Sequence, residues 1–398
     1  MLKPIMPVYN PAPIAPVRGE GVWLFEQNGA AWLDCIGGVA SNALGHCHRV
    51  LIQALSAQAE KLWHVSNLLQ VPGQAALAER LISTTFADTA FFCNTGTEAV
   101  ECAIKTARRF HNRNGAPERV DIVGFSGSFH GRTYAAINAS GNAAYLDGFG
   151  PAMAGFKHVD LDNAEDVRAA ILAPTTAAVI VEPVQGEGGA RALREDDLRR
   201  LRELTTGAGV LLIYDEVQSG MGRTGRLFAH QWFEGVEPDI MAVAKALGSG
   251  FPVGACLSTA VAASGMSPGA HGSTFGGNPL AMAVASAAFD FIANPETLAH
   301  VRLVEARLRD GLAALASRYP DIILELRGKG LLIGARLRSE NRAFMAAARD
   351  QRLLIAGGGD NCIRLLPPLT ITTDEADEVL ARLEATCAAM ATRISDAA

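Results

Sequence analysis

The chain alternates between stretches with the apolar spacing of helices and short runs that are apolar throughout. Helical spacing predicts helices over 48–61, 74–85, from Thr97 onward, and over 278–293. The continuous apolar runs lie at 90–93, 177–181, 210–214 and 240–244, and a further strand is predicted over 120–125. Such runs are typical of strands that helices cover on both faces of a mainly parallel sheet. We therefore predict an α/β protein built on a large, doubly wound, mainly parallel sheet.

The two ends of the chain depart from this alternation. Residues 1–19 are rich in proline and are predicted to form an extended arm, and Asn28-Gly29 predicts the turn of a short hairpin. Beyond the large sheet, the pattern predicts helices over 296–318, 340–351 and 373–392 and strands over 322–327, 331–337 and 362–366. We expect an arm and hairpin over 1–47 that belong to a smaller α+β domain, a large domain over 48–293, and the rest of the small domain over 294–398.

Composition narrows the class of protein further. Apolar residues make up 49% and charged residues 19% of the 398 residues, which excludes disorder as the dominant state. The net charge of −6 and the scattered Lys and Arg residues argue against nucleic-acid binding. No apolar run approaches the roughly 18 residues of a membrane span. The seven cysteines form no CxxC pair, which indicates reduced thiols in a cytoplasmic protein, and the charge pattern instead predicts a small-molecule partner.

Ligands of open α/β sheets bind beyond the carboxyl ends of the strands, so polar residues that follow strands are candidates for a site. The segment 94–97, which contains Gly96 and Thr97, joins a strand to a helix and places free amides where an anion can bind. A capping box between Thr95 and Glu98 accounts for the same residues, and the two interpretations are compatible.

Three further strand ends carry charged residues. Asp215 and Glu216 follow one buried strand, where a carboxylate needs a cation, either a protonated pyridine nitrogen or an arginine such as Arg223. Lys245 leaves another strand, and burial there would favour the neutral amine that attacks an aldehyde, whereas a solvated lysine is the alternative. The segment 182–189 adds two carboxylates beside a glycine-rich turn, which can also be a turn without a function. A phosphate cradle, a carboxylate for a ring nitrogen and an imine-forming lysine together meet the requirements of pyridoxal phosphate.

The segment 212–220, followed by Asp239-Ile240 and by Lys245 at its spacing, resembles the signature of class III, fold type I, pyridoxal-phosphate aminotransferases. The similarity extends over nearly the whole chain. Five other segments resemble the acetylornithine aminotransferase subfamily, namely 17–21, 44–48, 64–68, 129–133 and 364–369. Position 67 is followed by Leu68-Leu69-Gln70, where many relatives place aromatic residues, so the acyl end of the substrate could be handled differently.

The resemblance implies roles for single residues at the cofactor. Lys245 forms the Schiff base, Asp215 pairs with the pyridine nitrogen, and Gln218 approaches the phenolic oxygen. Phe129 stacks on the ring. Gly96 and Thr97 hold the phosphate, and Thr274 reaches it from the neighbouring subunit, so the active site belongs to a homodimer.

The resemblance also implies roles at the substrate. Arg132 meets the carboxylate of the ω-amino substrate, and Arg364 binds the α-carboxylate of glutamate. Glu187 pairs with Arg364 when that pocket is switched off, and Ser273 is assigned to substrate binding. The alternative for either arginine is a structural ion pair.

The implied reaction transfers the δ-amino group of N2-acetylornithine to 2-oxoglutarate, a step of arginine biosynthesis. Ornithine, succinylornithine, succinyldiaminopimelate and 4-aminobutyrate are alternative amine donors. A distant alternative is a nicotinamide-linked oxidoreductase, because Gly220-x-Gly222-x-x-Gly225 matches a dinucleotide fingerprint, but no strand directly precedes it and no helix is expected after it. His46-Cys47-His48 is interpreted as a turn, and no metal is expected.

Overall fold

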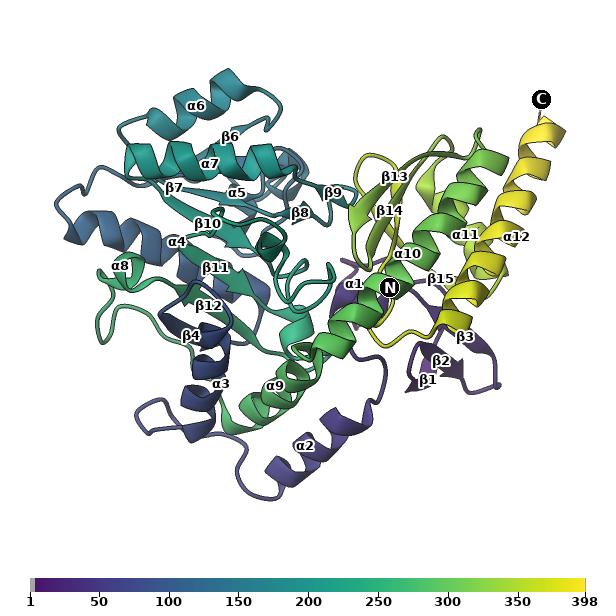
Figure 1. Cartoon of the computed structure of the whole chain (residues 1–398), viewed down its shortest axis with the longest axis horizontal. Coiled ribbons are helices and arrows are strands. Elements are labelled where there is room, and N and C mark those ends of the chain that lie inside the picture. The colour runs from purple at the N-terminus through teal and green to yellow at the C-terminus, as the bar shows by residue number, and fades with distance from the viewer. Residues whose placement is uncertain (1–3, 398) are drawn as a thin grey trace.

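The computed structural model describes residues 4–397, so the first three residues of the predicted arm and the last residue of the chain lie outside the described part. Figure 1 shows two lobes, a larger one that contains a wide twisted sheet and a smaller one that contains both labelled chain ends. The helices α9 (Pro279–Ile292) and α10 (Pro295–Arg318) follow each other and connect the larger lobe to the smaller one.

The large sheet has seven strands in the order β4-β12-β11-β10-β7-β5-β6. Their bounds are β4 Thr89–Cys93, β12 Gly254–Ser258, β11 Ile240–Val243, β10 Leu211–Asp215, β7 Thr176–Val181, β5 Asp121–Phe125 and β6 Phe156–Val159. The pairs β11–β10, β10–β7, β7–β5 and β5–β6 are parallel, whereas β12 runs antiparallel to both of its neighbours. The predicted strands are therefore found, and the sheet is mainly parallel, as predicted.

Helices cover both faces of this sheet, which explains why its central strands are apolar throughout. The helix α4 (Gly96–Arg113) buries Ala99, Val100, Ala103 and Ile104 against one face, together with α5 (Tyr134–Ala139). The other face is covered by α3 (Pro72–Ser83), α6 (Ala164–Leu172), α7 (Glu195–Ala208) and α9, and α2 (Arg49–Ala59) packs on α9. Burial of each large apolar side chain contributes about 1.5–3 kcal/mol, so this double cover stabilises the sheet.

The smaller lobe joins sequence segments from both ends of the chain. Its antiparallel sheet has the order β13-β14-β17-β16, with β13 Ile323–Lys329, β14 Leu332–Leu337, β17 Cys362–Leu365 and β16 Ala356–Gly358. A second sheet contains β1 Pro16–Glu20, β2 Trp23–Glu26, β3 Ala31–Asp34 and β15 Leu353–Leu354. The helices of this lobe are α10, α11 (Asn341–Asp350) and α12 (Thr373–Ala397). The pairing of β15 with β3 attaches the N-terminal hairpin to the C-terminal part of the chain.

The arm prediction is wrong at its C-terminal end. Residues 16–20 form β1, which pairs antiparallel with β2, so the hairpin is the second half of a three-stranded meander. Pro16 begins this edge strand, where its missing N–H costs no ladder hydrogen bond.

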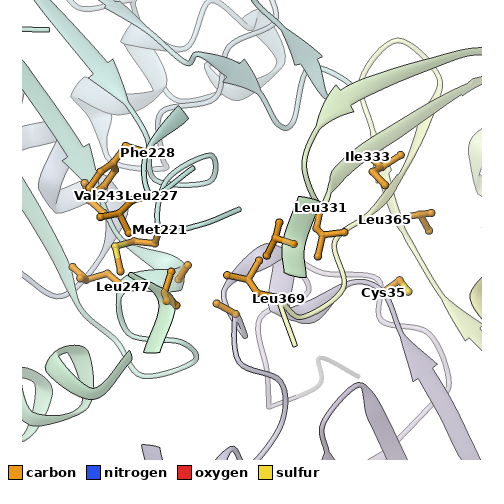
Figure 2. Packing of buried hydrophobic residues seen from close by; sticks show 14 of the residues in the cluster. Cys35, Met221, Leu227, Phe228, Val243, Leu247, Leu331, Ile333, Leu365 and Leu369 are labelled. Atoms are coloured by element: carbon orange, nitrogen blue, oxygen red, sulfur yellow. The ribbon is translucent and has the colours of Figure 1, made fainter. Parts of the chain in front are cut away.

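Apolar side chains from both lobes meet in one core cluster. Met221, Leu227 and Val243 of the larger lobe and Leu331 and Leu369 of the smaller one are all buried in this cluster. Figure 2 shows the two groups facing each other across the boundary between the lobes. The carboxyl ends of the large sheet are therefore next to β17, the strand that carries Arg364.

Candidate active site

A cavity of about 250 Å³ lies beyond the carboxyl ends of the large sheet. Its walls contain residues from five separate segments of the sequence, all of them at or just after a strand end or a helix start. They are Thr95, Gly96, Thr97, Phe129, His130, Gly131, Arg132, Glu182, Glu187, Asp215, Val217, Gln218 and Lys245. Nine of the residues predicted from the sequence are thus placed at or beside one cavity, namely Gly96, Thr97, Phe129, Arg132, Glu187, Asp215, Gln218 and Lys245 in its wall and Arg364 in contact with Glu187 and Gln218.

The anion site predicted at residues 94–97 is the N-terminus of α4. Thr95 is the N-cap, and its hydroxyl accepts a hydrogen bond from the Glu98 amide at 3.2 Å. The Glu98 carboxylate accepts the amide of Asn94, the residue before the cap, at 2.8 Å, so the Thr95 half of the predicted capping box is present and the reciprocal bond comes from one residue earlier. Gly96 follows the cap, and a Cβ at this position would lie 2.6 Å from Val217 Cγ1. The absence of a side chain there keeps the first helical amides open to the cavity.

Asp215 pairs with a histidine and not with Arg223. His130 Nδ1 and Asp215 Oδ2 are 2.8 Å apart, and both side chains are buried. The other carboxylate oxygen accepts the Val217 amide at 3.0 Å. Arg223 instead donates to the carbonyl oxygens of Leu331 and Pro367, so the arginine alternative considered for Asp215 is wrong. Asp215 is therefore an oriented carboxylate at the cavity wall, as the pyridine partner requires.

Lys245 comes two residues after the end of β11 and lines the same cavity. Burial lowers the pKa of its ammonium group, while the negative charges of Glu187 and Asp215 partly oppose this shift. Its backbone has a φ of 44°, a left-handed conformation that is strained for a residue with a long side chain. A lowered pKa raises the share of neutral amine, which is the nucleophilic form.

Glu187 and Arg364 form the ion pair that the resemblance implied. The two carboxylate oxygens lie 2.7 and 2.9 Å from the two terminal nitrogens of the guanidinium group, which is a bidentate geometry. Arg364 is buried and also donates to Gln218 Oε1 at 3.3 Å and to the Gly357 carbonyl oxygen. Burial acts to raise the pKa of Glu187, but Arg364 outweighs this effect, so the pKa lies below its ordinary value and Glu187 stays charged.

Two wall residues, His130 and Glu182, were given no role from the sequence, although Glu182 is one of the two carboxylates noted in the segment 182–189. Glu182 accepts the amides of Phe129 at 2.8 Å and Gly186 at 3.0 Å. Burial raises the pKa of Glu182 to about 7, and its neighbours His130 and Asp215 act in opposite directions on it. The position of both residues within motifs already quoted was the only available signal, because their partners lie far away along the chain.

Ser273 and Thr274 lie outside the cavity of their own chain. The Ser273 hydroxyl accepts hydrogen bonds from Asn94 and from the Gly276 amide, and Thr274 is exposed. Their predicted roles in substrate and phosphate binding remain predictions that depend on a second copy of the chain.

The competing motifs have structural explanations. A Cβ at Gly222 would lie 2.7 Å from Ile292 Cγ2, so this glycine of the dinucleotide-like segment faces packed side chains and opens no helix. His46 Nε2 lies 2.9 Å from Asp34 Oδ2. Among residues 4–392, whose side chains the structure describes, no group of three or more His, Cys, Asp or Glu could hold a metal ion.

The wall residues fit pyridoxal phosphate. The helix N-terminus with Gly96 suits the phosphate, and Asp215 suits a protonated ring nitrogen. Gln218 Nε2 is a buried donor without a hydrogen-bond partner among the described residues, which suits a phenolic oxygen. The Phe129 ring borders the same cavity and can cover one face of a planar group.

Comparison with known proteins agrees with this site. The family model of class III aminotransferases matches residues 5–387, and the chain belongs to this family of pyridoxal-phosphate enzymes. Acetylornithine aminotransferase 2 of Caulobacter vibrioides is 60% identical, over 97% of this chain and 95% of that protein. The N-acetylornithine aminotransferase structure of Stenotrophomonas maltophilia K279a has a TM-score of 0.84 and 37% identity, covering 96% of this chain and 98% of that one. The ornithine aminotransferase structure of Toxoplasma gondii ME49 has a TM-score of 0.93 and 31% identity, covering 98% and 93%.

Proposed function

We propose that this aminotransferase transfers the δ-amino group of N2-acetyl-L-ornithine to 2-oxoglutarate, giving N-acetyl-L-glutamate 5-semialdehyde and L-glutamate. The observation that supports this reaction best is that, of two arginines at one cavity, one has an ion-pair partner and the other has none among the described residues. Arg364 is covered by Glu187, whereas Arg132 borders the cavity without an ion-pair partner among the described residues. Relatives of this chain that are 50–60% identical carry the name acetylornithine aminotransferase, which supports the acylated substrate.

The two arginines allow one cavity to accept two different amines. With Glu187 on Arg364, Arg132 is left to bind the carboxylate of acetylornithine, whose reacting amine is at the opposite end of the molecule. When glutamate binds, its α-carboxylate takes the place of Glu187 on Arg364. Glu187 is able to leave because its side chain is only partly buried, while Arg364 is almost fully buried. The backbone stays in place because Glu182 holds the neighbouring Gly186 amide.

Each residue at the cavity then has a separate role in the reaction. Bound pyridoxal phosphate supplies an electron-accepting ring that stabilises negative charge at the substrate carbon next to the reacting nitrogen. Asp215, oriented by His130, keeps the ring nitrogen protonated, and Phe129 shields one ring face from water. Lys245 removes the proton from the substrate carbon that carries the amine, because its burial favours the neutral, basic form.

Replacement of Lys245 tests the central assignment. We expect Lys245→Ala to lower kcat by at least the roughly 10²–10⁴-fold typical of a lost general acid–base. Borohydride treatment should fix the cofactor on the peptide that contains Lys245 in the wild type and not in the variant. Substantial turnover by the variant would contradict the assignment.

A panel of amines tests the substrate. The wild type should have its highest kcat/KM with N2-acetylornithine, compared with ornithine, N2-succinylornithine, N-succinyldiaminopimelate and 4-aminobutyrate, each with 2-oxoglutarate as acceptor. A clear preference for an amine without an acyl group would overturn the proposed substrate and leave the aminotransferase assignment intact.

We further propose that the enzyme is a cytoplasmic homodimer in which Thr274 of the partner subunit completes the phosphate site. The exposed position of Thr274, outside its own cavity, supports a role in trans. All seven cysteines are free thiols, which is consistent with a reducing compartment. Within residues 4–397, each helix is too short or too polar to cross a membrane.

A further inference from the structure

Arg132 is held by two aromatic rings. Its guanidinium carbon lies 4.2 Å from the ring centre of Tyr145 and 5.5 Å from that of Phe129. The two rings are 5.7 Å apart and nearly perpendicular, at 86°. Phe129 is part of the predicted cofactor site, but no role has been given to Tyr145 above.

The aromatic contact and a carboxylate would use different parts of the guanidinium group. A ring attracts the flat face of the cation, whereas a carboxylate binds to the N–H groups along its edge. Among the described residues, Arg132 has neither an ion pair nor a side-chain hydrogen bond, so its edge donors remain available. The same is not true of Arg364, whose donors are occupied by Glu187, Gln218 and a carbonyl oxygen.

Tyr145 is placed by its own segment and not by Arg132. It ends the short helix η1 (Ala143–Tyr145), where the Asn142 side chain accepts the Ala144 amide at 3.0 Å. Contacts on both sides of this segment hold it in place. Gly141 packs so closely on the Phe125 carbonyl oxygen that a Cβ would lie 2.7 Å away, and the Met153 amide donates to Asn138 at 2.8 Å. The position of the Tyr145 ring is therefore fixed by its own segment, and the flexible Arg132 side chain can pack on it.

We propose that Tyr145 is a positioning residue for substrate selection, whose ring holds Arg132 so that the edge of the guanidinium group faces the carboxylate of the ω-amino substrate. This inference rests on the proposed function, because it gives Arg132 the role of carboxylate receptor. A free arginine side chain loses rotamer entropy when it binds a ligand, and a stacked one has lost part of that entropy beforehand. Tyr145 thereby acts on carboxylate-bearing amines and is indifferent to amines that lack this group.

The test compares two variants with two amines. Tyr145→Leu removes the aromatic face, and Tyr145→Phe keeps it and is the matched control. The amines are N2-acetylornithine and N-acetylputrescine, which has the same amine and acyl group but no carboxylate. For acetylornithine we expect Tyr145→Leu to lower kcat/KM by about 2- to 30-fold, the range that corresponds to one cation–π contact. Tyr145→Phe should stay within about twofold of the wild type, since it retains the ring.

Two additional measurements distinguish a role of Tyr145 in placing Arg132 from a general loss of protein structure. The inhibition constant of N-acetylnorvaline, which carries the carboxylate but no reacting amine, should rise with Tyr145→Leu by the same factor as kcat/KM falls. In an Arg132→Leu background, Tyr145→Leu should have no further effect on acetylornithine. Cofactor content and Tm should match those of Tyr145→Phe.

Two results would overturn the inference. One is an equal loss of kcat/KM for acetylornithine and acetylputrescine, which would indicate a structural role for the ring. The other is an unchanged inhibition constant for N-acetylnorvaline in Tyr145→Leu. If the wild type instead prefers another carboxylate-bearing amine, the substrate proposal fails, and the same variants are compared with that amine and its carboxylate-free analogue.

Discussion

Glu182 illustrates how one side chain connects several parts of the active site. Its two carboxylate oxygens accept the amides of Phe129 and Gly186, so one residue positions the ring-stacking phenylalanine and the residue before Glu187. A buried carboxylate with only amide donors is costly in its charged form. Burial accordingly raises its pKa to about 7, so that Glu182 changes its charge near neutral pH.

The raised pKa predicts a pH-dependent effect of Glu182→Gln. Between about pH 4.5, the ordinary value, and about pH 7, the folded protein binds this proton more tightly than the unfolded chain does, so folding stability falls as pH rises through this window. Glutamine does not titrate, so the difference in Tm between Glu182→Gln and the wild type should become more favourable to the variant from pH 5 to pH 8. Differential scanning calorimetry measures this difference, and Glu60→Gln, at an exposed glutamate, serves as the control. A difference that stays constant with pH would contradict the assigned titration.

At the scale of single elements, the start of α4 depends on one missing side chain. Gly96 begins the helix whose amides face the cavity, and the nearest neighbour of an added Cβ would be Val217, which follows Asp215 at the end of β10. The helix start and the strand end therefore pack directly on each other through this glycine. Valine is stiff at χ1 and cannot move aside freely.

Gly96→Ala should weaken cofactor binding. Overpacking of this kind costs about 1–3 kcal/mol, so we expect the dissociation constant of pyridoxal phosphate to rise by roughly 5- to 150-fold if the strain falls on the bound state. Absorbance titration of the apoprotein with the cofactor measures this constant. Gly207→Ala, in the last turn of α7 and with open space around the added methyl group, should leave it unchanged and should stabilise the fold by about 0.4–1 kcal/mol. Equal affinities in the two variants would show that the packing at Gly96 is not required.

At the scale of the whole molecule, Arg223 connects the two lobes. It is fully buried, and its guanidinium group donates to carbonyl oxygens of Leu331 at 3.1 Å and Pro367 at 2.5 Å in the smaller lobe. Burial lowers its pKa to about 9, since no carboxylate compensates the charge. Pro367 is close in sequence to Arg364, so this contact helps to hold the substrate arginine at the cavity.

The molecule also exposes large apolar side chains in one region of its surface. Leu68 is 93% exposed and Phe275 is 59% exposed, and hydrogen bonds from Asn67 to the carbonyl oxygens of Ser273 and Gly276 join their two segments. Contiguous exposed apolar patches are typical of protein interfaces, and these two side chains lie on joined segments. The neighbouring Thr274 is the residue that we assign to the partner's phosphate site.

Charged substitutions at this surface test the proposed homodimer. We expect Leu68→Lys combined with Phe275→Lys to shift the enzyme from dimer to monomer in sedimentation velocity and to reduce the bound cofactor, because each phosphate site would lose Thr274 of the partner subunit. Leu172→Lys, at an exposed leucine on α6, is the control and should remain dimeric. A double variant that is dimeric and retains its cofactor would place the interface elsewhere.

The sequence by itself was sufficient for the order of the elements and for the class of chemistry. Apolar runs and helical spacing are local properties, so they predicted five of the seven strands of the large sheet, β4, β5, β7, β10 and β11, and missed β6 and β12. The ends of the predicted strands led to Gly96, Asp215 and Lys245. The antiparallel direction of β12 and the pairing of β1 were decided by the tertiary structure, because they depend on neighbours distant in the chain.

The contacts that the site residues make with one another were also decided by the tertiary structure and not by the local sequence. His130 meets Asp215, Glu182 joins two loops, and Tyr145 lies on Arg132. Each of these contacts is set by the order and register of strands, which bring distant segments to one edge of the sheet. Residue type and spacing can indicate which chemistry a chain carries, whereas the direction, charge state and partner of each group follow from the packing around it.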